Sequence, residues 1–190
     1  MNTIRLPNSY VPVKKVDLQK NIKLAVLVNI GAIVLAILVI VLGSVFVPVF
    51  YLFSSLFWNG LIMLFGSLLY MVLHELTHGF FMKRFSGVKP KYGFTGLYAY
   101  AKCNAFFDKK SYFIITLSPI ILLGVVLAAI CFFVPTQLFW GVYLIQAINI
   151  SGAAGDIYVS FLLCRMPKEL LVYDFGASMF FYLPKEYAAK

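Results

Sequence analysis

Two long stretches of almost uncharged sequence dominate the pattern of hydrophobic and polar positions. The first, residues 24–82, contains one charged side chain, Glu75, and the second, residues 111–164, contains one, Asp156. A helix needs about 20 apolar residues to cross a bilayer, so each stretch can hold two spans and a short turn. The pattern therefore predicts an all-α integral membrane protein with four transmembrane helices.

Prolines and charged residues set the expected ends of the spans within these stretches. Pro48 would end the first span, and Pro119 would bend or loosen the third. We expect a single membrane domain over residues 1–190, with spans at about 24–47, 56–85, 112–134 and 138–164 and a cytoplasmic tail at 165–190. The tail is amphipathic and aromatic, which favours a position along the membrane surface.

The segment from Lys89 to Lys110 has a different pattern. Its residues Tyr98-Ala99-Tyr100-Ala101 alternate with period two, as a strand does. We therefore expect this cytoplasmic loop to form a short β-hairpin at the membrane interface.

Charge placement orients the chain. All 16 Lys and Arg side chains lie before residue 24, between residues 83 and 110, or after residue 164, and neither expected turn between spans carries a charge. This distribution follows the positive-inside rule and predicts a multi-pass protein of the cell membrane with both termini in the cytoplasm. The net charge of +9 then reflects topology and attraction to lipid headgroups. Nucleic acid is not an expected partner, because no groove-reading or base-stacking module accompanies the charge.

The chain has only two histidines, and they stand four residues apart in His74-Glu75-Leu76-Thr77-His78. Positions i and i+4 share one face of a helix, so both imidazoles can bind one tetrahedral Zn²⁺ ion. Glu75 lies one step around the helix and can act on a water molecule bound to the metal. The alternative is that the histidines only bond to neighbouring helices. It leaves the cost of a carboxylate inside a bilayer unexplained.

A catalytic zinc ion usually has a third protein ligand. Asp156 is the only other acid in an apolar stretch, and it precedes Arg165 by nine residues, just as His74 precedes Lys83. Helices rise 1.5 Å per residue, so both residues would lie roughly 13 Å from the basic boundary. Asp156 is therefore the expected third ligand, with Glu169 and Asp174 in reserve.

Two further features of the last span bear on this site. The residues before Asp156, Ser151-Gly152-Ala153-Ala154-Gly155, are small, which allows close helix approach or local unwinding. Asn149 lies seven residues before Asp156 on the same helical face. It could donate a hydrogen bond to a developing oxyanion or simply bond to a neighbouring helix.

With these residues the chain resembles a family of small bacterial membrane proteins, the zincin peptidases, and more distantly the site-2 intramembrane metalloproteases. The similarity covers roughly residues 70 to 180. It rests on His74-Glu75-Leu76-Thr77-His78-Gly79, Ser118-Pro119, the segment from Asn149 to Gly155-Asp156, and the segment from Pro167 to Asp174.

The resemblance to site-2 proteases implies Asp156 as the third zinc ligand and Asn149 as a catalytic helper. The chain departs from that pattern, because Ile157 follows Asp156 where the pattern has glycine and the usual intervening proline is absent. The departure affects the geometry of the third ligand more than its identity.

The leading hypothesis is an intramembrane zinc metalloprotease that cleaves membrane-embedded or membrane-proximal peptides. Its partners would be the lipid bilayer and a membrane-spanning peptide or protein substrate; the sequence does not indicate an oligomeric state. A non-catalytic zinc-binding membrane protein, such as an immunity or accessory factor, is a second possibility, although such a protein has no need of Glu75. A zinc or proton transporter is a third possibility. Four spans with a single polar cluster would give it few polar groups to line a transport pathway.

Overall fold

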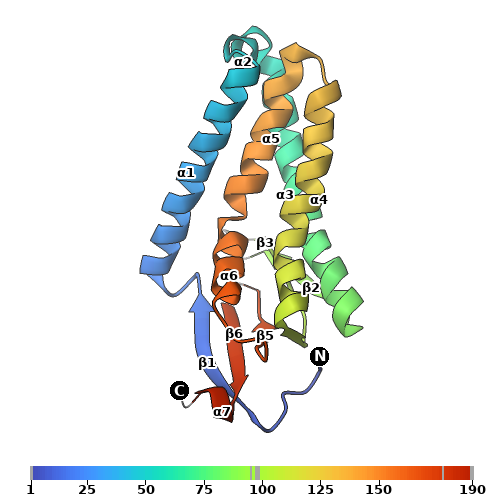
Figure 1. Cartoon of the computed structure of the whole chain (residues 1–190). Helices are drawn as coiled ribbons and strands as arrows, with labels where there is room; N and C mark the ends of the chain where they lie inside the picture. The colour runs from blue at the N-terminus through green and yellow to red at the C-terminus, as the bar shows by residue number, and fades with distance from the viewer. Residues whose placement is uncertain (1, 95, 97–98, 177, 189–190) are drawn as a thin grey trace. The chain divides into compact units, whose positions relative to one another are not determined.

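The computed structural model describes residues 2–94, 96, 99–176 and 178–188. The helices are α1 (Ile22–Phe46), α2 (Phe50–Ser54), α3 (Leu56–Ser86), α4 (Lys109–Phe133), the 3₁₀ helix η1 (Thr136–Leu138), α5 (Phe139–Gly152), α6 (Ala154–Cys164) and α7 (Lys185–Ala188). The strands are β1 (Tyr10–Asp17), β2 (Lys91–Phe94), β3 (Ala99–Lys102), β4 (Phe106–Asp108), β5 (Leu171–Asp174) and β6 (Ser178–Pro184), as labelled in part in Figure 1.

The chain forms two compact units. One consists of Leu27–His74 and Pro119–Gly155, and it contains no Lys, Arg, Asp or Glu, so we call it the uncharged unit. The other consists of Met1–Val26, Glu75–Ser118 and Asp156–Lys190, and it holds every charged side chain of the sequence. We call it the charged unit.

Helix α5 forms hydrogen bonds with helices α1 and α3 within the uncharged unit. The Tyr143 hydroxyl donates to the carbonyl of Val39 on α1 at 2.7 Å, and Oδ1 of Asn59 on α3 accepts from the Gly141 amide at 2.8 Å. Glycines allow two of these approaches: a methyl group at Gly43 would overlap the Tyr143 ring, and one at Gly66 would overlap Ile145. Small residues thus bring the backbones together, an arrangement that is common in membrane helix bundles.

Among the residues that the structure describes, three single helices are long and apolar enough to cross a membrane: α1, α3 and α4. The most apolar stretch of α1 has no buried residue, and large apolar side chains such as Val34 and Leu38 are exposed along it. Such a surface is costly in water and suits contact with lipid. These helices lie close to three of the expected spans.

The expectation of a fourth continuous span at residues 138–164 is wrong. That segment consists of α5 and α6, and the helical pair that includes η1 is bent by 40° at Ala153. The physical reason lies in the sequence Gly152-Ala153-Ala154-Gly155. Glycine weakens a helix interior, and no bulky side chain stabilises the turn at this point.

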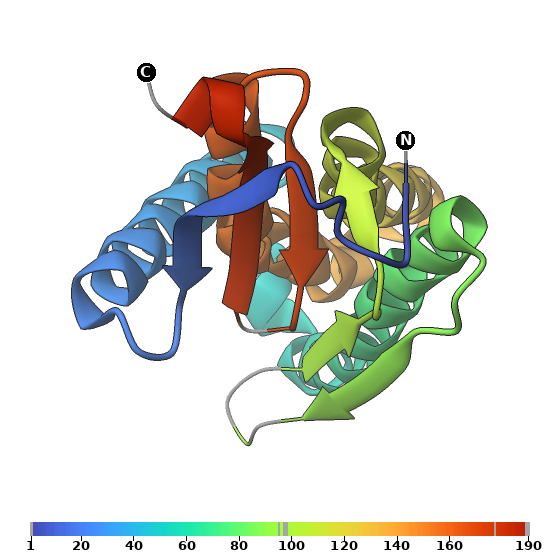
Figure 2. The same cartoon turned by 90° about the horizontal axis from the view of Figure 1, so that it is seen from below.

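The all-α expectation is also wrong, because the charged unit contains a four-stranded antiparallel sheet with the strand order β1-β6-β5-β4. Figure 2 shows β6 between β1 and β5. Alternate residues of β6, namely Met179, Phe181 and Leu183, are buried and pack with Phe107 and Leu163 in the core of this unit. The tail expected along the membrane surface therefore supplies two strands.

The expected hairpin between Lys89 and Lys110 is confirmed, since β2 and β3 pair antiparallel from Lys91↔Lys102 to Phe94↔Ala99. Tyr98, part of the alternation that predicted it, lies outside the described residues. Within the described part of the chain, this two-stranded sheet has no third strand. Tyr92 of β2 packs against Gly79 of α3, where an added methyl group would overlap the phenol. The hairpin thus contacts the helix that carries both histidines.

Candidate metal centre

The last turns of α3 carry His74, Glu75 and His78. The helix runs without interruption from Leu56 to Ser86, so the two histidines lie one turn apart on one face. Both are buried, each with 9% of its surface exposed. Buried imidazoles require hydrogen-bond partners, and these partners determine how each ring is oriented.

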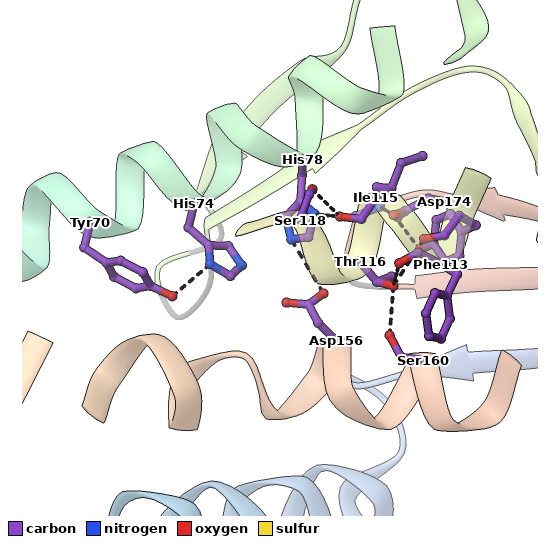
Figure 3. Close-up of polar contacts among 12 residues, drawn as sticks. Tyr70, His74, His78, Phe113, Ile115, Thr116, Ser118, Asp156, Ser160 and Asp174 are labelled. Carbon is purple, nitrogen blue, oxygen red and sulfur yellow. Dashed lines mark hydrogen bonds and ion pairs between the residues drawn. The ribbon is translucent and has the colours of Figure 1, made fainter. Parts of the chain in front are cut away.

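Each imidazole has a partner at its Nδ1 atom, as the dashed lines in Figure 3 show. The Tyr70 hydroxyl lies 2.8 Å from His74 Nδ1, and the carbonyl oxygen of Ile115 on α4 lies 2.8 Å from His78 Nδ1. A carbonyl can only accept, so His78 Nδ1 carries the proton and Nε2 is the atom available to a metal. The same arrangement at His74 follows if its Nδ1–H donates to the Tyr70 oxygen.

Asp156 enters the centre from the first turn of α6. Its Oδ1 atom lies 3.5 Å from His78 Nε2. The bend at Ala153 begins a new helix just before Asp156, and a carboxylate in a first helical turn interacts favourably with the helix dipole. The small residues before Asp156 therefore place the carboxylate at a helix start.

One ligand atom from each of His74, His78 and Asp156 lies within 4.8 Å of the others. Ligands about 2.1 Å from a tetrahedral zinc ion lie about 3.4 Å apart, a separation close to the 3.5 Å between His78 and Asp156. Two imidazole nitrogens and one carboxylate oxygen also match the usual donor set of a catalytic zinc site. The residues present therefore fit a Zn²⁺ ion after small side-chain movements.

Neither reserve ligand is a member of this group. Glu169 is exposed. Asp174 on β5 is buried, where its carboxylate accepts hydrogen bonds from the Tyr112 hydroxyl and the Gly176 amide, both at 2.7 Å. Burial raises the pKa of Asp174 to about 6, although both hydrogen bonds favour the charged form. Asp174 thus joins the tail to α4.

Asn149 is completely buried on α5. Its Nδ2 atom donates to the carbonyl of Ile120 on α4 at 3.1 Å, beside Gly124. Its Oδ1 atom has no hydrogen-bond partner among the described residues. These contacts show Asn149 bonding to a neighbouring helix. Its participation in catalysis stays a prediction.

Sequence reasoning missed the groups that orient the histidines. Tyr70 has a sequence signal, because it stands four residues before His74 and helical geometry puts the two on one face. The Ile115 carbonyl has none of its own, since any backbone carbonyl looks alike in a sequence. Thr116 and Ser160, whose hydroxyls lie 2.9 Å apart and join α4 to α6, were missed as well.

Residues 67–171, more than half of the chain, match the family described as "Putative zincin peptidase". The match includes both histidines, Glu75 and Asp156. No curated protein and no solved structure shows significant similarity to the chain. The expected likeness to site-2 proteases is therefore without support from these comparisons.

Proposed function

The chain belongs to the zincin-peptidase family, and we propose that it is an intramembrane zinc metalloprotease that cleaves membrane-embedded or membrane-proximal peptides. The observation that carries the proposal is the group formed by His74, His78 and Asp156, with Glu75 on the same helix as the histidines. The family supports peptidase chemistry. The apolar helices α1, α3 and α4 support a location in the membrane.

Each residue has one role in the proposed reaction. His74 and His78, through Nε2, and Asp156, through a carboxylate oxygen, would hold the ion. A bound zinc ion supplies Lewis acidity, which activates water and polarises the scissile carbonyl. Glu75 would accept the proton of the attacking water and pass it to the leaving amine. Asn149 is retained as a proposed helper that donates to the developing oxyanion.

The substrate must present an extended segment, because a helical one hides its carbonyls in backbone hydrogen bonds. The hairpin β2–β3 offers a site for such a segment. Its Tyr92 contacts Gly79, the residue after His78, and burial first and the charge of Glu75 second raise the pKa of the Tyr92 hydroxyl. We propose that the substrate pairs with this hairpin as an added strand.

For the membrane topology, we propose that the charged unit faces the cytoplasm. It contains all 16 basic side chains, and basic segments beside membrane helices stay on the cytoplasmic side. Water for hydrolysis would then enter from that side. Both termini belong to this unit, so both would be cytoplasmic.

The decisive variant is Glu75→Gln, which keeps the shape of the side chain and removes the base. We expect it to retain one zinc ion per chain and to lose at least about a hundredfold in the cleavage rate of model transmembrane peptides in lipid nanodiscs. Glu169→Gln, an exposed acid in the same unit, is the matched control and should cleave at the wild-type rate. Zinc is counted by atomic absorption and cleavage by mass spectrometry.

Undiminished cleavage by Glu75→Gln would refute the role of Glu75. A wild-type protein that binds zinc and cleaves none of the peptides, with no growth difference from the Glu75 variant, would favour the non-catalytic alternative. Zinc flux into sealed vesicles would favour the transporter.

A further inference from the structure

We infer that Pro119 is a positioning residue for the metal centre: by leaving the Ile115 carbonyl without a helical donor, it makes that carbonyl the acceptor that orients His78. The inference rests on the proposed function to the extent that His78 is a zinc ligand. The sequence marked this proline as a bend or a loosening and as part of the resemblance to the zincin peptidases; the inference gives it a specific role.

The chain geometry of α4 makes the Ile115 carbonyl special. In an α-helix the carbonyl of residue i accepts from the amide of residue i+4, and the residue four beyond Ile115 is Pro119. Proline has no amide hydrogen, and its ring pushes the carbonyl of the preceding turn away from the helix axis. Among the residues of α4, Ile115 is thus the one whose carbonyl is left without a helical donor by Pro119.

Two side chains bond to this carbonyl instead. His78 Nδ1 lies 2.8 Å from the Ile115 oxygen, and the Ser118 hydroxyl donates to it at 3.0 Å. Ile115 is almost completely buried and His78 nearly so. Because a buried carbonyl must find a partner and water has little access, the bond from His78 is strongly favoured.

The bond fixes the imidazole in the form that a metal ligand requires. With Nδ1–H donating to the carbonyl, Nε2 is left on the side of the ring nearest Asp156, 3.5 Å from its Oδ1 atom. Partners of this kind set the tautomer and orientation of metal-binding histidines. A simple kink would need no histidine at the freed carbonyl.

The first experiment replaces Pro119 by alanine in the full chain, in nanodiscs. Pro119→Ala supplies the missing amide and removes the ring, so the Ile115 carbonyl can return to the helix ladder. We expect zinc affinity, measured by competition with a chelating dye, to fall about tenfold to a hundredfold. The melting temperature of the metal-free protein should not fall, because alanine is the better helix former.

Two comparisons isolate the cause. Ser118→Ala removes the other donor to the same carbonyl and should change zinc affinity less than about threefold. An alanine analogue at position 119 whose backbone N–H is replaced by an ester oxygen lacks the competing donor, as proline does. It should restore most of the lost affinity.

The spectroscopic readout uses the fact that the chain has only two histidines. With ¹⁵N-histidine labelling and no histidine tag, the Nδ1 proton of His78 should be seen as slowly exchanging in the wild type and as fast exchanging in Pro119→Ala. Unchanged zinc affinity and an unchanged Nδ1 proton in a folded Pro119→Ala protein would overturn the inference. If Pro119→Ala does not fold, loss of the slow proton in the ester variant would overturn it.

The two proposals fail separately. A wild-type protein that binds no zinc contradicts the proposed function, whereas the Nδ1 proton of the metal-free protein tests Pro119 independently of zinc and of cleavage.

Discussion

In the uncharged unit, the buried polar side chains bond mainly to backbone groups. Asn59 and Tyr143 bond to carbonyls or amides of other segments, and the Trp140 indole donates to the Pro48 carbonyl at 3.2 Å. In the charged unit, one of the buried hydrogen-bonding groups is a carboxylate, that of Asp174, which accepts from the Tyr112 hydroxyl. In the uncharged unit, neutral side chains thus satisfy backbone hydrogen-bonding groups of loops and turns. In the charged unit, a carboxylate is buried.

The surfaces of the two units also differ in charge. The uncharged unit exposes long rows of large apolar side chains and no charge, which suits lipid as its solvent. The charged unit carries Lys and Arg together with a sheet whose edge strand β1 contains Lys14 and Lys15. Helix α3 passes from one unit into the other between His74 and Glu75.

The strongest test of this comparison places a lysine on each unit. Val34 lies at the middle of α1 and is 49% exposed; Val13 on β1 is 38% exposed. If lipid surrounds α1, Val34→Lys should cost about 2.5–3.5 kcal/mol of insertion free energy. It is measured as the membrane-inserted fraction of the full chain, with engineered glycosylation sites.

Val13→Lys is the matched control and should change insertion by less than about 0.5 kcal/mol. Equal effects of the two lysines would mean that the uncharged unit does not lie in lipid, and the proposed membrane location would have to be abandoned.

A second test compares an asparagine from each unit. Asn59 is 1% exposed and joins four backbone groups: its Oδ1 accepts from Gly141, and its Nδ2 donates to the carbonyls of Tyr51, Leu52 and Gln137. Alanine would leave the buried Gly141 amide without its acceptor and remove three further bonds, so Asn59→Ala should cost about 2 kcal/mol or more of unfolding free energy in detergent.

Asn2 of the charged unit bonds to three groups from separate segments and is only half-buried. Water can replace its lost bonds, so Asn2→Ala should cost about 1 kcal/mol. A larger loss of unfolding free energy for Asn2→Ala than for Asn59→Ala would contradict the proposal that water reaches the partners of Asn2 more easily than those of Asn59.

The helices of the uncharged unit were predictable because their signals are local. Charge or proline bounds each apolar run, and the expected spans at 24–47, 56–85 and 112–134 differ from α1, α3 and α4 by at most three residues at either end. The metal group was predictable for a related reason. Helical spacing pairs His74 with His78, and equal distance from the basic boundary pairs them with Asp156.

The sheet was not predictable because its signals are not local. Strand β6 buries alternate residues, yet Phe180 and Tyr182 on the other face are aromatic too, which hides the alternation. Its partner β1 lies at the opposite end of the chain and contains Pro12 and a bulge. The bend at Ala153 was open to either reading, since small residues favour close packing and unwinding alike.

The smallest expected effect concerns Asp174 and Asp17, two acids of the charged unit whose pKa values are shifted in opposite directions. Burial raises the pKa of Asp174 to about 6, whereas the hydrogen bond with Lys15 lowers the pKa of Asp17. Between pH 6 and pH 4 the folded protein takes up a proton at Asp174 before the unfolded chain does. The metal-free protein should therefore gain stability through this residue as the pH falls, at up to about 1 kcal/mol per pH unit.

Asp174→Asn keeps one oxygen, which can accept from either the Tyr112 hydroxyl or the Gly176 amide, and it cannot titrate. It should remove that gain, so the unfolding free energy of the wild type minus that of the variant should rise as the pH falls from 6 to 4. Asp17 should contribute a slope of the opposite sign, and only near pH 4, because the unfolded chain takes up a proton at Asp17 before the folded protein does; Asp17→Asn removes that contribution. Unfolding in detergent at a series of pH values measures both slopes. An Asp174→Asn protein with the wild-type slope would mean that this carboxylate is hydrated, and the charged unit would then bury no charge in its core.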